Sequence, residues 1–175
     1  MSYSAFAGFD HIASGSLAQV YAASSQTPQS LIFDRETGRV VDVDPRFPPQ
    51  DDSPRPGRPK LGVTPREVTL LPRHWDWLAT QPGGASVALR KLVEEARRAH
   101  AGRDRARQAQ EAAYRFMSAM AGDRPGFEEA TRALFAGHRD RFNQLTEPWP
   151  KDVRQHARKL AAEALDGLAA ARPGS

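Results

Sequence analysis

The segment from Asp44 to Pro59, DPRFPPQDDSPRPGRP, limits the possible folds of this chain more than any other, because six of its sixteen residues are proline. Proline fixes φ and lacks a backbone N–H, so such a run cannot form the interior of a helix or a sheet. Proline-rich segments instead adopt the extended conformations that are typical of linkers. We therefore expect a linker over residues 45–60 that separates structured parts on either side.

The residues before the linker predict a small β-α-β-β unit. Residues 3–13 mix aromatic and small apolar side chains in a strand-like pattern, and residues 16–23 have the composition of a short helix. Residues 30–34 and 39–44 read as two strands, and the intervening residues contain a glycine that suits a hairpin turn. A unit of this size is marginally stable alone, so it needs a further surface to pack against.

The residues after the linker show a strand pattern followed by two helices. Residues 66–71 include strand-forming side chains, and Pro72 ends this strand because it can begin a helix but cannot extend a sheet. We expect a first helix from Arg73 to about Thr80 and a break at residues 82–84. A second helix is expected from Val87 to about Arg98, with apolar side chains at helical spacing. The alternative is that this helix continues with a kink through residues 100–110, which are good helix formers apart from Gly102.

This order of basic arm, strand, helix, turn and helix resembles the ribbon-helix-helix family of DNA-binding proteins. The resemblance implies a homodimer in which one strand from each chain joins a ribbon that enters the major groove, while the helices build the dimer core. The expected core residues are Val68, Leu70, Trp75, Leu78, Leu89, Leu92 and Val93. Two sets of strand residues remain candidates for the outward face, namely Arg66, Val68 and Leu70, or Glu67, Thr69 and Leu71.

The centre of the chain is its most basic part. Residues 57–108 carry eleven Lys or Arg against five Asp or Glu, a net +6 in a chain whose total is +4. Such a concentration of positive charge is typical of a surface that binds the phosphates of a nucleic acid. A solvent-exposed, arginine-rich helix face that binds nothing would carry the same excess of charge. The run Gly57-Arg58-Pro59-Lys60 resembles the core of AT-hook peptides, which implies an arm in an AT-rich minor groove. The expected contacts to double-stranded DNA come from Arg58, Lys60, Arg66, Thr69, Arg73, Arg97, Arg98, Arg103 and Arg107.

The remaining residues predict a helical bundle. Residues 111–120, 127–134 and 142–149, and those after Pro150, each carry apolar side chains at helical spacing. The predicted fold class is α+β and mostly helical. The predicted divisions are a small α+β unit at 1–44, the linker at 45–60, a ribbon-helix-helix-like segment at 61–100, a helical bundle at 101–170 and a tail at 171–175.

The sequence contains no catalytic signature, so we expect a protein that is not an enzyme. There is no cysteine, and no two of the five histidines lie three to five residues apart. This pattern predicts no metal site and no cofactor. Neither a Ser-His-Asp spacing nor a phosphate-binding glycine loop is present. No apolar run approaches the roughly 18 residues of a membrane span, and no signal peptide is recognisable, which together predict a cytoplasmic protein without a membrane partner.

Most of the chain also resembles a bacterial family of unknown function. The resemblance rests on GRPKLGV-x2-REVTLLPRHWDWLATQPGGASVALRKLVEEARR and on the later run EAAYRFMSAMAGDRPGFEEATRALFAG. It implies no activity and no site residues. The sequence thus predicts a dimeric DNA-binding protein, a transcriptional regulator, with residues 66–71 as ribbon and residues 57–60 as arm. The alternative is a protein-interaction or scaffold protein that uses residues 61–100 only to dimerise.

Overall fold

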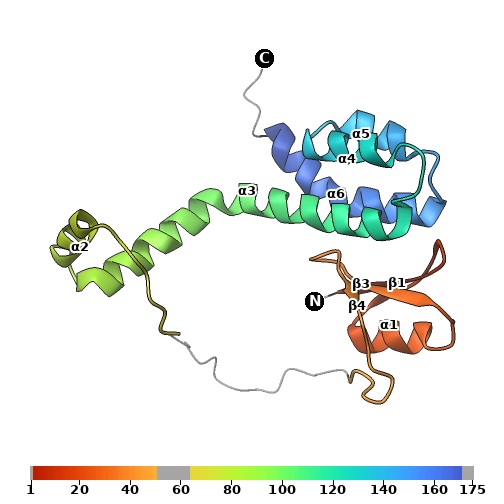
Figure 1. The fold of residues 1–175 in the computed structure, drawn as a ribbon, viewed down its shortest axis with the longest axis horizontal. Coiled ribbons are helices and arrows are strands. Elements are labelled where there is room, and N and C mark those ends of the chain that lie inside the picture. The colour runs from red at the N-terminus through yellow and green to blue at the C-terminus, as the bar shows by residue number, and fades with distance from the viewer. Residues whose placement is uncertain (1, 51–63, 171–175) are drawn as a thin grey trace. The chain divides into compact units, whose positions relative to one another are not determined.

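The computed structural model describes residues 2–50 and 64–170, and the chain divides into two compact units (Figure 1). Unit 1 comprises residues 1–52 and 102–175, and unit 2 comprises residues 53–101. Helix α3 (Gly84–Ala121) contributes its first part to unit 2 and its remainder to unit 1. The fold class is α+β and mostly helical, as the sequence predicts.

Unit 1 begins with a four-stranded antiparallel sheet in the order β2-β1-β3-β4. Its strands are β1 (Tyr3–Ala7), β2 (Asp10–Gly15), β3 (Ser30–Asp34) and β4 (Val40–Val41). The two predicted strands at 30–34 and 39–44 are confirmed, although the second is shorter. Residues 3–13 form most of a hairpin rather than a single strand, because Gly8 adopts a φ of 57° that lets the chain reverse.

Helix α1 (Leu17–Ser24) covers one face of this sheet. Ser16 begins the helix with a capping box, in which the Gln19 backbone N–H donates to Ser16 Oγ and the Ser16 N–H donates to Gln19 Oε1. This confirms the short helix predicted at 16–23. The buried residues between the helix and the sheet are Ala5, Val20 and Ile32.

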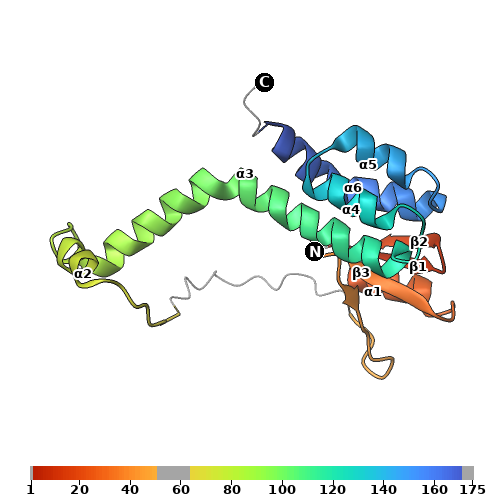
Figure 2. The same cartoon turned by 45° about the horizontal axis from the view of Figure 1, so that its top comes forward.

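The opposite face of the sheet packs against helices. Successive strand residues point to opposite faces, so Phe6 and Phe33 point away from α1. Both contact Phe116 of α3, with ring centroids 5.3 Å apart for Phe6 and 5.0 Å apart for Phe33. Figures 1 and 2 show α1 on one side of the sheet and the last part of α3 on the other. These helices supply the packing surface that so small a sheet requires.

The turn between β3 and β4 lies directly on α3. Gly38 has a φ of 67°, and a Cβ added at this glycine would lie 2.0 Å from the carbonyl oxygen of Ala112. One residue earlier, the Thr37 carbonyl accepts a hydrogen bond of 3.0 Å from Arg115 Nη1. Glycine is therefore required at position 38 both for the left-handed backbone and for the close approach of two backbones.

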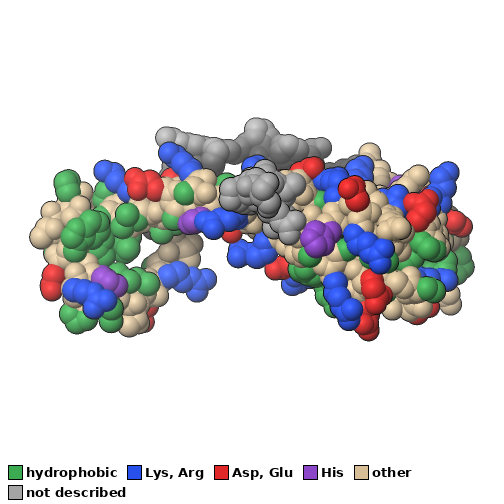
Figure 3. Space-filling model, turned by 90° about the horizontal axis from the view of Figure 1, so that it is seen from above, with side chains coloured by type: hydrophobic (Ala, Val, Ile, Leu, Met, Phe, Trp, Pro, Cys, Tyr) green, Lys and Arg blue, Asp and Glu red, His purple; other side chains and the backbone are tan. Residues whose placement is uncertain are grey.

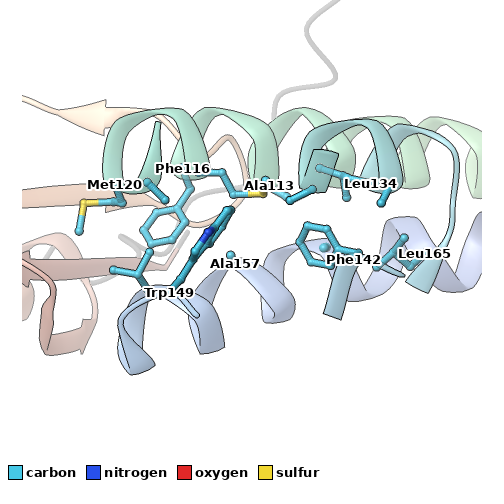
Figure 4. Close-up of a cluster of buried hydrophobic side chains, with 14 of the residues drawn as sticks. Ala113, Phe116, Met120, Leu134, Phe142, Trp149, Ala157 and Leu165 are labelled. Atoms are coloured by element: carbon cyan, nitrogen blue, oxygen red, sulfur yellow. The ribbon is translucent and has the colours of Figure 1, made fainter. Parts of the chain in front are cut away.

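The last part of α3 packs with α4 (Phe127–Phe135), α5 (Arg139–Thr146) and α6 (Lys151–Ala170). Trp149 lies in their shared core, and its indole N–H donates to the Pro125 carbonyl at 3.2 Å. The predicted C-terminal helices are confirmed, although the third begins at residue 139 rather than 142. Figure 4 shows the core residues Ala113, Phe116, Met120, Leu134, Phe142, Trp149, Ala157 and Leu165.

Unit 2 contains α2 (Pro72–Ala79) and the first part of α3. The helix predicted from Arg73 to about Thr80 is confirmed, and Pro72 occupies its first turn, where a missing N–H costs no hydrogen bond. Of the two ends expected for the second helix, near Arg98 or beyond residue 110, the structure has the later one, because α3 continues through Gly102 to Ala121. The intervening residues are mostly Ala, Arg and Gln, whose helix propensity outweighs one glycine.

The strand predicted at residues 66–71 is not formed within the chain, since residues 64–71 lie outside any helix or strand. Pro65 and Pro72 flank the segment, and the described part of unit 2 contains no strand with which it can pair. Leu71 instead caps α2, because its carbonyl accepts hydrogen bonds from the backbone of His74 and Trp75. The predicted linker beyond residue 50 and the basic arm at 57–60 lie outside the described residues.

Candidate functional site

Unit 2 has very little core of its own. Within residues 64–101, the buried side chains are Leu78 of α2, which is 2% exposed, and Ala88 of α3, which is 8% exposed. Leu70 and Leu89 are half-buried. The glycines at 83 and 84, with φ of 83° and 76°, make the turn that brings α2 back onto α3. Two helices that share so few buried residues leave most of their apolar surface uncovered.

Most residues predicted for the dimer core are exposed in the single chain. Val93 is 63% exposed and Val68 is 55% exposed, and only Leu78 of the predicted set is buried. Residues 64–101 are less than a quarter of the described chain but hold six of its twelve exposed large apolar side chains. Figure 3 shows hydrophobic side chains on the surface of the lobe that contains α2. The six residues, which we call the apolar surface of unit 2, are Val68, Leu71, Trp75, Trp77, Leu92 and Val93.

The side chains of Arg66, Thr69 and Arg73, predicted to contact DNA, are exposed. On α3, Arg97 Nη2 donates to Glu94 Oε1 at 3.0 Å, and Arg98 Nε lies 3.5 Å from the same oxygen. The hydrogen bond from Arg97 lowers the pKa of Glu94. Exposed ion pairs of this kind are weak in water, so they leave both arginines able to exchange the carboxylate for a phosphate.

The other predicted DNA contacts lie elsewhere. Arg103 and Arg107 belong to the part of α3 in unit 1, and their spacing of four places them on one face of the helix. Arg107 Nη2 donates to Asp104 Oδ1 at 3.0 Å. Arg58 and Lys60 are outside the described residues. The predicted contact set is therefore divided between two units, and unit 2 holds the larger share.

A second polar cluster, which the sequence did not predict, lies in unit 1 between the sheet and α6. It surrounds a cavity of about 210 Å³, which we call the sheet–α6 cavity. His11 Nε2 and Ser14 Oγ are 2.8 Å apart, and Asp152 Oδ2 accepts a hydrogen bond of 2.9 Å from the backbone N–H of His11. The lining residues are His11, Ser14, Arg35, Asp152, Gln155, His156 and Lys159.

His156 is the most deeply buried residue of this cavity, at 8% exposed. Its ring lies against Phe6, at 5.2 Å between centroids, and against Phe116, at 4.6 Å. Burial, followed by the charges of Arg35, His11 and Lys159, lowers the pKa of His156 to about 4. Its imidazole is therefore neutral near pH 7. Within the described residues, neither His156 Nε2 nor Arg35 Nε has a hydrogen-bond partner, although both atoms are buried.

One part of this cluster leaves a signal in the sequence. Asp152, Gln155, His156 and Lys159 follow the spacing that places residues on one face of a helix. The other lining residues lie more than a hundred positions earlier, so only the packing of the sheet on the C-terminal helices brings them together.

The described residues hold neither a metal-ligand cluster nor a membrane-spanning helix. No group of three or more His, Cys, Asp or Glu side chains within residues 2–50 and 64–170 is arranged to hold a metal ion. In the same ranges, no helix has the length and apolar character needed to cross a membrane.

No curated protein and no solved structure matches this chain. A family model described as "Uncharacterized protein conserved in bacteria (DUF2239)" matches residues 2–161. The matched range includes all of unit 2 and every residue that lines the sheet–α6 cavity. The chain therefore belongs to this family of proteins conserved in bacteria.

Proposed function

We propose that this protein is a homodimer that binds double-stranded DNA through unit 2 and acts as a transcriptional regulator. The observation that carries the proposal is that unit 2 combines an uncovered apolar surface with an excess of positive charge. Residues 53–101 contain nine Lys or Arg against four Asp or Glu, a net +5, whereas the whole chain carries +4. The positive charge is thus concentrated in the unit with the smallest core.

The apolar surface of unit 2 supports the dimer. Six large apolar side chains stay exposed in this one small unit, and such a gathering is what an interaction surface requires. A second copy of the chain is the proposed occupant, because a symmetric dimer places the same patch of both subunits in one interface. Residues 64–70 lie outside any strand, so their backbone groups are also open to pairing with the same segment of that copy.

The positive charge supports the DNA contact. Arg66 and Arg73 are exposed, so their guanidinium groups can reach phosphate oxygens. Arg97 and Arg98 compete for a single carboxylate oxygen of Glu94, so at least one of them is available to another anion at little cost. In a dimer each of these contacts occurs twice, which doubles the number of phosphates neutralised.

A protein-interaction function is the second candidate, and a specific observation favours it. Trp75 and Trp77 are 41% and 51% exposed on α2, and tryptophan is enriched at interfaces between proteins. In this case the apolar surface of unit 2 serves dimerisation or a protein partner, and the basic residues are a solvated face. The two functions differ in their salt dependence, because only phosphate neutralisation releases counterions.

The DNA function predicts binding that is strongly weakened by salt. In fluorescence anisotropy with mixed-sequence and AT-rich duplexes, the dissociation constant is expected in the micromolar range or below at about 50 mM salt. It should rise at least tenfold at about 200 mM salt, because six or more phosphate contacts lose roughly a thousandfold over this range. Replacing Arg97 and Arg98 by alanine should lower the slope of log K against log salt by about one for each contact removed.

The control removes the same charge from unit 1. Arg141 and Lys151 are exposed, and their replacement by alanine should leave DNA affinity within about twofold, the range of a nonspecific change in net charge. An Arg58→Ala/Lys60→Ala variant tests the arm directly, and a selective loss on AT-rich duplexes is expected. Absence of binding at low salt, or equal losses in the unit 1 and unit 2 variants, would contradict the proposal.

A further inference from the structure

We propose that the sheet–α6 cavity binds the phosphate group of a small phosphorylated molecule. The inference starts from two buried side-chain nitrogens that lack hydrogen-bond partners within the described chain, Arg35 Nε and His156 Nε2. Buried polar groups in proteins are almost always hydrogen-bonded, because an unsatisfied one loses its hydration without compensation. Both residues line the same cavity, so a ligand bound there can supply the missing hydrogen-bond partners.

The charge of the cavity selects an anion. Arg35 and Lys159 both line it, and the charges of both act on His156. Asp152 is the single carboxylate among the lining residues, all of which belong to the described chain, and one of its oxygens already accepts from the His11 backbone. Within the described chain Arg35 forms no ion pair, so its guanidinium has no built-in counter-ion. A guanidinium in this situation is a donor for the oxygens of a phosphate.

The imidazoles complete the donor set. A neutral histidine carries its proton on one nitrogen only, and a phosphate oxygen next to His156 Nε2 favours the tautomer in which that nitrogen donates. The rings of His11 and His156 are nearly parallel, with centroids 6.4 Å apart, and both line the cavity. Phe6 and Phe116 hold the His156 ring from the sides, so the direction of Nε2 is fixed before any ligand arrives.

An adjoining cavity provides room for the rest of the ligand. It measures about 470 Å³ and shares Arg35 and Lys159 with the sheet–α6 cavity. Its other lining residues include the aliphatic side chain of Leu160 and the polar side chains of Gln108 and Arg105. The 210 Å³ cavity lies below the size of most pockets for whole organic ligands, which span roughly 300–1,000 Å³. We therefore assign the smaller cavity to the phosphate and the larger to its substituent.

Neither water nor a metal ion accounts for these features. A water molecule can satisfy one orphan nitrogen, but the two cations that line the cavity, Arg35 and Lys159, favour an anion. A divalent cation requires several anionic or neutral donor ligands, and among the described residues no such group exists here.

The test is a titration of the full-length protein with inorganic phosphate and with methyl phosphate at constant ionic strength, followed by NMR of the histidine rings. The resonances of His156, assigned with a His156→Gln variant, are expected to shift and saturate. Arg35→Gln and Lys159→Gln should each weaken binding about tenfold or more, as expected for the loss of a charge-assisted hydrogen bond. Lys159 is exposed, so its replacement leaves the core of unit 1 intact even if Arg35→Gln unfolds.

The matched control is Arg39→Gln, which removes an exposed positive charge from the same turn without touching the cavity and should leave the affinity unchanged. Titration with acetate distinguishes a phosphate site from a site for any anion. Acetate should need at least a tenfold higher concentration than phosphate to shift the NMR resonances of the His156 ring. Unsaturable shifts, or phosphate binding that survives both cavity variants, would overturn the inference. DNA binding by unit 2 does not enter this experiment, so the two proposals stand or fall separately.

Discussion

Replacement of Phe116 by alanine is expected to lower the free energy of unfolding of this protein by about 3–5 kcal/mol, the range for deleting a buried aromatic ring. Phe116 is fully buried, and its ring contacts Phe6, Phe33 and His156 at centroid distances of 5.3, 5.0 and 4.6 Å. These partners come from β1, β3 and α6, so the ring joins the sheet to the helices of unit 1. Alanine at this position opens a cavity where three elements meet.

Urea denaturation followed by circular dichroism measures this loss. Tyr114→Ala on the same helix is the control, because Tyr114 is 40% exposed and its replacement should cost less than about 1.5 kcal/mol. Equal losses in the two variants would show that the sheet does not depend on Phe116 for its packing.

The second large effect is expected for Gly38→Ala, with a loss of about 2–6 kcal/mol in the free energy of unfolding. Alanine must adopt the left-handed backbone at a φ of 67°, and its Cβ meets the Ala112 carbonyl oxygen at 2.0 Å. Backbone strain and overpacking each contribute about 1–3 kcal/mol. Because Ala112 lies on α3, the substitution forces the β3–β4 turn away from the helix.

Gly8→Ala separates these two contributions. Gly8 also has a positive φ, of 57°, but a Cβ added there would meet no atom within 4 Å. This variant should therefore lose only the backbone contribution, about 1–2 kcal/mol. If both glycine variants lose the same stability, the contact between Gly38 and α3 is not present in solution.

The sequence predicted most helices and strands but not how far each extends. Apolar spacing located α2 and the C-terminal helices because those faces are buried against neighbours. It did not locate the end of α3, since alanine is the only apolar residue type besides Gly102 between Arg98 and Glu111 and gives a weak periodic signal. Their helix propensity is the better guide, and Gly102 alone is too weak an interruption.

The strand prediction for residues 66–71 was wrong within one chain for a different reason. Strand propensity reports a side chain's fit to a pleated surface, and that surface exists only where a neighbouring strand is present. The described part of unit 2 offers none. Strand propensity in this segment is therefore not sufficient to form a strand within one chain.

The sheet–α6 cavity was missed because its residues are far apart in the sequence. Arg35 and His156 are separated by more than a hundred residues, and neither belongs to a recognisable motif. Only the packing of the sheet on α3 and α6 brings both residues to one cavity. Sequence spacing identifies the cavity residues on one face of α6, but only the folded structure shows which residues of the sheet lie opposite them.

Sedimentation equilibrium of the full chain tests the central claim, that the apolar surface of unit 2 joins two copies. Over roughly 1–100 µM, the range in which a specific dimer should form, the expected mass is twice the chain mass of 19.3 kDa. A Leu92→Lys/Val93→Lys variant should shift the protein to the monomer, because it places charges in the interface at two exposed positions that the single chain does not need for folding. A wild-type protein that remains a monomer at every concentration would contradict the dimer and, with it, the proposed DNA-binding arrangement.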